Sequence, residues 1–133
     1  MPNFEALLQS IAKRPAMYVG KCSIRAVSHY LEGYCHALGD AGYAETPLDG
    51  WGRWIESRFL IAHPAWHWTR ILLHIYGSDL AAIEALPQLH HEFLARRATL
   101  GIEGIEHDHK RRFLAEHGQD WYEPSATRTT IDD

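Results

Sequence analysis

Long hydrophobic runs are absent from this chain of 133 residues, and cysteine is scarce. No apolar run approaches the roughly 20 residues that cross a bilayer, and the N-terminus lacks the continuous apolar core of a signal peptide. We therefore predict a cytoplasmic protein with no membrane segment. The two cysteines, Cys22 and Cys35, could be bridged, but reduced thiols in a cytosolic protein are the simpler interpretation.

Sequence motifs for catalysis are also missing. The chain contains neither a Gly-x-Ser-x-Gly nucleophile elbow nor a Walker phosphate-binding loop. Cys22 at a helix N-terminus could be an activated thiol with His29 or His36 near it, but a cysteine with several histidines is common by chance. We therefore predict that the protein is not an enzyme and needs no cofactor.

Ten histidines raise the question of a metal site. The densest groups are three pairs: His63 with His67, His90 with His91, and His107 with His109. Pro64 interrupts the first pair, the second points about 100° apart on a helix, and the third has equally poor spacing for one ion. The chain has no His-Glu-x-x-His element and no cysteine pair at zinc-finger spacing. We predict no metal, and a His-assisted, metal-dependent hydrolase is the alternative.

The balance of charge is mildly acidic, with a formal net charge of −4. This charge argues against general nucleic-acid binding. The acidity is uneven, because residues 1–66 carry six basic and six acidic residues, whereas residues 67–133 carry seven and eleven. An acidic surface suits a basic protein partner, and we expect Asp40, Glu45 and Asp49 to contact it.

Apolar residues at helical spacing predict an all-α fold. The first two stripes are Phe4, Leu7, Leu8 and Ile11, and then Ile24, Val27, Leu31, Tyr34 and Leu38. Asn3 and Ser23 are the expected N-caps of these two helices. Further helices are expected at about 49–62, from near Trp66 to a Gly77 C-cap, from a Ser78 cap onward, and at 103–117. Pro87 falls inside the fifth pattern, so we expect a kink or two short helices there.

Five or six helices occupy residues 1–123 in this prediction. The chain from 124 to 133 has no apolar periodicity, so we expect it to be a loose, flexible tail. A chain of this length forms one domain, which buries roughly two-thirds of its unfolded surface without disulfides.

The segment 13–20, Lys-Arg-Pro-Ala-Met-Tyr-Val-Gly, joins the first two predicted helices. Its motif residues are Arg14, Pro15, Met17, Tyr18 and Gly20. The proline disfavours helical geometry at the residue before it, and the final glycine permits a turn with positive φ. We expect residues 17–19 to be apolar anchors of an extended connection. The joint would then fix the angle between two helices, and a direct contact role for Arg14 or Tyr18 is the alternative.

Tryptophan is concentrated in the middle of the chain. Four of the five tryptophans fall close together: Trp51, Trp54, Trp66 and Trp68. Trp66 and Trp68 are two positions apart, so on a helix one can enter the core while the other is exposed. An exposed tryptophan beside His67 and Arg70 would suit an interface hot spot, because Trp, Tyr and Arg dominate such sites. We predict partner contacts at Trp66, His67, Trp68 and Arg70. The alternative is that all four tryptophans are core or half-core residues.

The joint resembles the start of the ATPase domain of DNA gyrase and its relatives, which carries Lys-Arg-Pro-Gly-Met-Tyr-Ile-Gly before a helix. Ala16 and Val19 replace the Gly and Ile of that string. The next helix of that family bears a Glu and an Asp-Asn pair for water activation and magnesium, whereas this chain offers Glu32 without the pair. The later glycine-rich nucleotide lid is also missing. The resemblance therefore does not imply ATP hydrolysis.

A second resemblance covers residues 3 to about 95. The chain looks like a family of short bacterial proteins with a Lys-Arg-Pro-x-Met-Tyr-x-Gly opening. The other matching stretches are Gly33-Tyr34, residues 65–73, residues 78–83 and Phe93-Leu94. The departure is at residues 63–68, His-Pro-Ala-Trp-His-Trp, which could carry partner specificity. The resemblance implies a role as an immunity protein of a bacterial toxin system.

Resemblance and composition lead to one functional prediction with two alternatives. The prediction is a cytoplasmic immunity protein that binds and neutralises a cognate toxin protein without covalent chemistry. The alternatives are the metal-dependent hydrolase named above and a small regulatory module whose Trp-rich face binds a peptide or a nucleotide.

Overall fold

The computed structural model describes residues 3–61 and 65–117, and the regular structure in these ranges is helical. Its six helices are α1 (Phe4–Lys13), α2 (Pro15–Val19), α3 (Ile24–Asp40), α4 (Trp51–Phe59), α5 (Trp68–Tyr76) and α6 (Asp79–His117). The predicted all-α fold of five or six helices is therefore confirmed. The predicted tail at 124–133 and the domain limit at residue 123 lie outside the described residues.

Local hydrogen bonds start and end four helices where the sequence predicts. The side chains of Asn3, Ser23 and Ser78 each accept a hydrogen bond from the backbone N–H three residues later, at 3.0 to 3.1 Å. These bonds satisfy N–H groups that have no partner within the first turn of a helix. Gly77 ends α5 at a φ of 86°, a left-handed conformation that glycine adopts without strain.

The joint between α1 and α3 differs from the predicted extended connection. Residues 15–19 form the short helix α2, with Pro15 in its first turn. A proline fits there because its fixed φ matches helical geometry and its missing N–H would have had no helical partner. Arg14 before it has a φ of −145°, and Gly20 after it has the expected positive φ, 82°. Residues 17–19 are therefore helical rather than extended, because the proline both ends α1 and starts α2.

α4 and α5 are shorter than predicted, because flanking residues leave helical geometry. α4 lies between Gly50 and Leu60, whose φ angles are 89° and 54°. α5 begins directly after His67 rather than near Trp66. His67 is extended, and its ring nitrogen Nδ1 accepts a hydrogen bond from the backbone N–H two residues later at 3.3 Å. Histidine thus acts as the N-cap of α5.

The break in α6 lies at Gly101, and the kink predicted at Pro87 is wrong. Gly101 has a φ of 75° and a ψ of 170°, whereas the helix continues through Pro87. A proline inside a helix removes one backbone hydrogen bond, but buried apolar neighbours offset that loss. Leu86 and Leu89 on either side of it are both 2% exposed. Packing therefore keeps this part of α6 helical.

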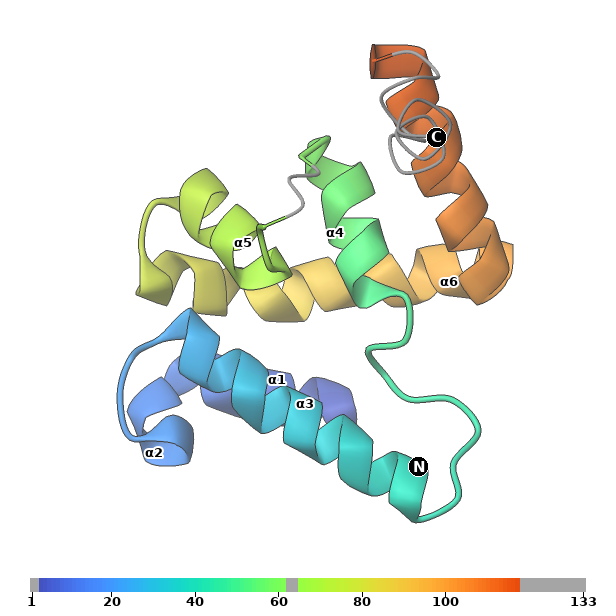
Figure 1. Ribbon diagram of the computed structural model, residues 1–133. Helices are drawn as coiled ribbons and strands as arrows, with labels where there is room; N and C mark the ends of the chain where they lie inside the picture. Colours follow the sequence, from blue (N-terminus) through green and yellow to red (C-terminus); the bar gives the residue numbers. More distant parts are fainter. Residues whose placement is uncertain (1–2, 62–64, 118–133) are drawn as a thin grey trace, which may run out of the picture.

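The first part of α6, before Gly101, is the centre of the fold. Figure 1 shows it crossing the molecule with α1 and α3 on one side and α4 and α5 on the other. After Gly101 the helix turns away from this direction. The fully buried apolar side chains come from both sides of α6 and from α6 itself, and they include Ile11, Val27, Leu31, Ile55, Ile71, Leu72, Ile83 and Phe93.

An aromatic cluster fills the core between α4, α5 and α6. The ring of Trp51 lies 5.5 to 5.8 Å from four others, which belong to Trp54, Trp68, His90 and Phe93. Trp51 Nε1 is buried with no hydrogen-bond partner among the described residues. The rings of Trp68 and Phe93 meet the Trp51 ring edge to face, at interplanar angles of 84° and 78°.

A candidate partner-binding surface

The segment before α5 and the first turn of α5 carry an aromatic and cationic contact on the outside of the molecule. The guanidinium carbon of Arg70 lies 4.5 Å from the centre of the Trp66 ring. Trp66 is half-buried and Arg70 is exposed, so the stack faces solvent along one edge. The imidazole of His74, one helical turn further, lies 5.6 Å from the Trp66 ring. Arg70 and His74 thus both contact the tryptophan ring.

His67 connects this stack to α3. Its Nδ1 caps α5 and lies 3.0 Å from the hydroxyl of the buried Thr69, while its Nε2 lies 3.4 Å from a carboxylate oxygen of Glu32. Both His67 and Glu32 remain about half exposed. The cap fixes the direction of the ring, and the packing of α3 against α5 brings Glu32 within reach of its other nitrogen.

The face of α3 next to this contact is polar and exposed. Glu32, His36 and Asp40 are each four residues apart, so they lie on one side of the helix. His36 Nε2 lies 3.5 Å from a carboxylate oxygen of Asp40, and both side chains are more than three-quarters exposed. Together with the stack they form the Trp66 surface, which we define by Glu32, His36, Asp40, Trp66, His67 and Arg70.

Three of the predicted contact residues do not belong to the Trp66 surface. Trp68 lies in the aromatic core and is 8% exposed. The Asp49 carboxylate accepts hydrogen bonds from the N–H and the hydroxyl of Thr46, both at 2.9 Å, so it closes its own loop. Glu45 lies 3.3 Å from the guanidinium of Arg97. The two carboxylates therefore take part in contacts that hold the loop before α4 against α6.

Glu32, His36 and His74 lie at or beside this surface, although the sequence did not single them out as partner contacts. The four-residue spacing of Glu32, His36 and Asp40 was a usable signal for one helical face. Nothing in the sequence indicated that this face lies beside His67, because the two segments are brought together only by the packing of α3 against α5.

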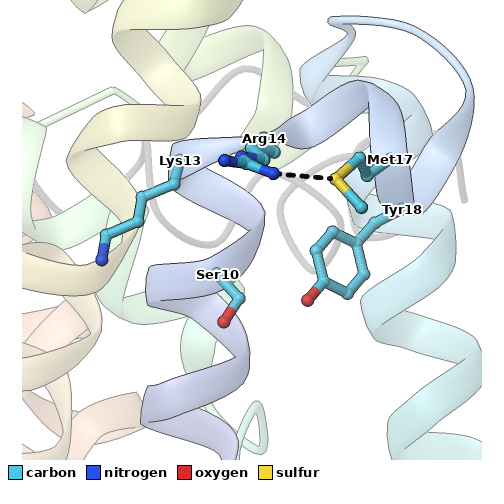
Figure 2. Close-up of a pocket in the computed structure, with 5 residues that line it drawn as sticks. All are labelled: Ser10, Lys13, Arg14, Met17 and Tyr18. Atoms are coloured by element: carbon cyan, nitrogen blue, oxygen red, sulfur yellow. Dashed lines mark hydrogen bonds between the residues drawn. The ribbon is translucent and has the colours of Figure 1, made fainter.

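The motif residues of the joint lie at a second surface. Pro15 is buried, whereas Arg14, Met17 and Tyr18 are exposed and line a pocket of about 310 Å³ with Ser10 and Lys13. Figure 2 shows Ser10 and Lys13 on α1 and Met17 and Tyr18 on α2, with the Arg14 guanidinium directed at the Met17 sulfur. That contact measures 3.8 Å. The joint thus connects α1 to α3 through α2 and also presents side chains to solvent.

Burial and neighbouring charges shift the pKa values of two groups in the interior, His90 and Cys35. Burial lowers the pKa of His90, and the charge of Arg97 acts in the same direction. The Nε2 of this ring lies 2.8 Å from the Pro47 carbonyl. Burial raises the pKa of the Cys35 thiol, which disfavours its reactive thiolate form. Both cysteines are free rather than bridged.

A polar network anchors the part of α6 after Gly101 on α4. The His109 Nε2 lies 2.8 Å from a carboxylate oxygen of Glu56. Burial acts to raise the pKa of Asp108, but a hydrogen bond from Arg111 and the charges of Arg112, Arg111 and Arg96 outweigh it and hold that pKa below its usual range. Arg112 also donates to the Ser57 carbonyl at 3.4 Å. This network has a structural role in positioning α6.

Two of the three histidine pairs considered for metal binding have one buried and one exposed member. His90 and His109 are buried, whereas His91 and His107 are exposed, and His63 lies outside the described residues. Within residues 3–61 and 65–117, no group of three or more His, Cys, Asp or Glu side chains is placed to hold a metal ion.

Comparison with known proteins found no matching family model, no similar curated protein and no similar solved structure. No helix in the described part of the chain has both the length and the apolar character needed to cross a membrane.

Proposed function

We propose that this protein is a cytoplasmic immunity protein that neutralises a cognate bacterial toxin by binding it in a non-covalent complex. The proposal rests on the resemblance over residues 3 to 95 and on one surface feature, the stack of Arg70 on Trp66. Binding alone is sufficient for this activity, so no bond needs to be made or broken.

The Arg70–Trp66 stack has the composition of an interface hot spot. Tryptophan and arginine are prominent among the side chains whose truncation costs about 2 kcal/mol or more of binding free energy. The Trp66 ring already contacts Arg70 and His74 in the absence of a partner. A surface that is already ordered loses less side-chain entropy when a partner docks.

Charge at the edge of the Trp66 surface favours a basic partner. Glu32 and Asp40 are exposed carboxylates on the adjoining face of α3. Exposed charges of one sign steer a partner of opposite sign and raise its association rate more than they raise affinity. A basic toxin surface around an apolar contact would therefore fit the Trp66 surface.

The test is protection from the toxin encoded beside this gene. Co-expression of this protein with that toxin domain should restore growth of a host that the toxin alone kills, and the two purified proteins should form a complex. Arg70→Ala and Trp66→Ala should each weaken the complex by about 2 kcal/mol or more, which is about thirtyfold in Kd.

Arg111→Ala is the matched control for Arg70→Ala. Arg111 is also an exposed arginine, but it lies on the part of α6 that Figure 1 shows turning away from α5. Its loss should leave both growth rescue and Kd unchanged, and thermal melts should show that each variant is folded. If the protein protects against no neighbouring toxin, the proposal is wrong; if Arg70→Ala and Arg111→Ala bind alike, the Trp66 surface is the wrong interface.

A further inference from the structure

The charges of the chain divide between its N-terminal helices and the rest. Residues 1–30 carry four Lys or Arg and a single acidic residue, whereas residues 31–133 carry nine and sixteen. The N-terminal segment of an overall acidic protein is therefore basic, although the Asp79 carboxylate of α6 lies at the start of α3 and accepts a hydrogen bond from the N–H of Ile24 at 2.9 Å. The four cations of this region are Lys13, Arg14, Lys21 and Arg25.

These cations lack the carboxylate partners that other arginines have. None of the four forms an ion pair within the described part of the chain, although Arg14 contacts the Met17 sulfur. In contrast, six arginines of α4 and α6 lie within 4 Å of a carboxylate: Arg53, Arg58, Arg96, Arg97, Arg111 and Arg112. The basic region thus keeps its charge available to another molecule.

Exposed apolar side chains lie among these cations. Met17 is 73% exposed, the largest exposure among the large apolar residues described. Tyr18 and Tyr30 are 37% and 38% exposed, and their rings meet edge to face at 6.1 Å. Methionine and tyrosine are enriched at protein interfaces, where a flexible thioether and a flat ring adapt to a partner.

The pocket at this place offers hydrogen-bond donors. Its lining combines the cations Lys13 and Arg14 with the hydroxyls of Ser10 and Tyr18, and neither hydroxyl has a hydrogen-bond partner among the described residues. Figure 2 shows Ser10 on α1 facing the space next to the Tyr18 ring, while the Lys13 side chain extends away from that ring. A carboxylate accepts hydrogen bonds from all of these groups, and charge-assisted bonds are the stronger ones.

We propose that the joint surface, defined as Ser10, Lys13, Arg14, Met17, Tyr18 and Tyr30, docks an acidic segment of a protein partner. A carboxylate of that segment enters the pocket beside Arg14 and Ser10, and an apolar side chain next to it covers Met17. A small inorganic anion would satisfy the donors but would leave Met17 exposed, so a peptide fits the whole surface better. The proposal concerns a surface other than the Trp66 surface and does not depend on the toxin.

The experiment selects ligands without assuming their sequence. A phage library of random peptides, each about a dozen residues long, is panned against the folded protein and counter-selected against its Lys13→Gln/Arg14→Gln variant. The enriched peptides should contain more Asp and Glu than the starting library, together with an apolar residue. A synthetic peptide from the selection is then measured by fluorescence anisotropy, and its affinity should fall as salt concentration rises.

Arg14→Gln and Arg70→Gln form the matched pair for this measurement. Each substitution removes one exposed cation and leaves the backbone hydrogen bonds of that residue intact. Arg14 lies between α1 and α2, and Arg70 lies in α5. Arg14→Gln should weaken the peptide about tenfold because it removes a charge-assisted bond. Met17→Ala should weaken it by a smaller factor, and Arg70→Gln should leave its affinity unchanged.

Four outcomes would overturn the proposal. Selected peptides could show no acidic enrichment, or Arg14→Gln and Arg70→Gln could lower affinity equally. Pyrophosphate could bind in the pocket without displacing the selected peptide, which would make the pocket a site for small anions rather than for a peptide. Sedimentation could show that the protein pairs with itself and that Arg14→Gln abolishes this pairing, which would make a second copy of the chain the occupant.

Discussion

At the scale of single residues, burial decides how otherwise identical side chains behave. His90 and His91 are neighbours in α6, yet His90 is 2% exposed and packs against Phe4, Trp51 and Phe93, whereas His91 faces solvent. A similar contrast separates the buried Trp68 from the half-buried Trp66. A side chain's chemistry in this protein therefore follows from its position in the fold rather than from its type.

His90 should make folding stability depend on pH. Its pKa is lowered by burial in the folded state, whereas a histidine in the unfolded chain has a pKa of about 6.5. Below that pH the unfolded chain binds more protons than the folded one, so stability falls as pH drops through about 6.5. Urea unfolding between about pH 7.5 and 5.5 should show a declining midpoint.

Two variants separate His90 from the other histidines. His90→Gln should lower stability at neutral pH, because rings around it lose contacts, but it should flatten the decline on acidification. His91→Gln should leave the decline as it is in the original protein. An equal slope in all three proteins would mean that other groups cause the pH dependence.

At the scale of elements, glycine marks the places where the backbone leaves ordinary helical geometry. The φ and ψ of Gly101, 75° and 170°, belong to a region that residues with a side chain almost never occupy. Gly33, in contrast, lies inside α3 with helical geometry and with no neighbouring atom that an added methyl group would meet. The same substitution should therefore have opposite effects at the two positions.

Gly101→Ala should destabilise the fold by about 1 to 3 kcal/mol. Backbone strain would be the cause rather than a steric clash, since no neighbouring atom lies within 4 Å of the added methyl group. Gly33→Ala should stabilise it by about 0.5 to 1 kcal/mol, because alanine loses less backbone entropy in a helix. Chemical denaturation of both variants measures these differences. A stabilising or neutral Gly101→Ala would mean that α6 can run straight through this point.

At the scale of the whole molecule, α6 is shared by both sides of the fold. Its first part contacts α1 and α3 as well as α4 and α5, and the network around Asp108 and His109 anchors its second part on α4. Because both groups of helices depend on contacts with α6, we expect them to unfold together. Both exposed surfaces lie on or beside helices that contact α6, except for α2, which packs on α1 and α3.

Unfolding should be a single cooperative transition. Tryptophan fluorescence reports mainly on α4 and α5, whereas far-ultraviolet circular dichroism reports on all helices, and the two curves should coincide. Phe93→Ala should lower the stability of the whole molecule by about 3 to 5 kcal/mol, because Phe93 is fully buried in α6 beside Trp51 and Trp54. Leu80→Ala at an exposed position is the control and should change little. Separate transitions by the two probes would contradict a shared core.

Four helix boundaries could be predicted from the sequence because their causes are local. Asn3, Ser23 and Ser78 cap helices by bonding to backbone three residues away, and Gly77 ends α5 through its own φ. The apolar stripes of α1 and α3 depend only on helical periodicity. Contacts between residues a few positions apart depend on the local sequence alone, so they form in the same way in any fold.

Features that join distant segments depended instead on how the whole chain packs. The kink expected at Pro87 did not occur, because core packing outweighs one lost hydrogen bond, and α6 bends at Gly101 instead. Glu32 meets His67 only because α3 packs beside α5, and Asp49 and Glu45 turn toward their own loop and Arg97. Periodicity states which side of a helix is apolar, but the neighbour that covers it is set by the joint packing of all the helices.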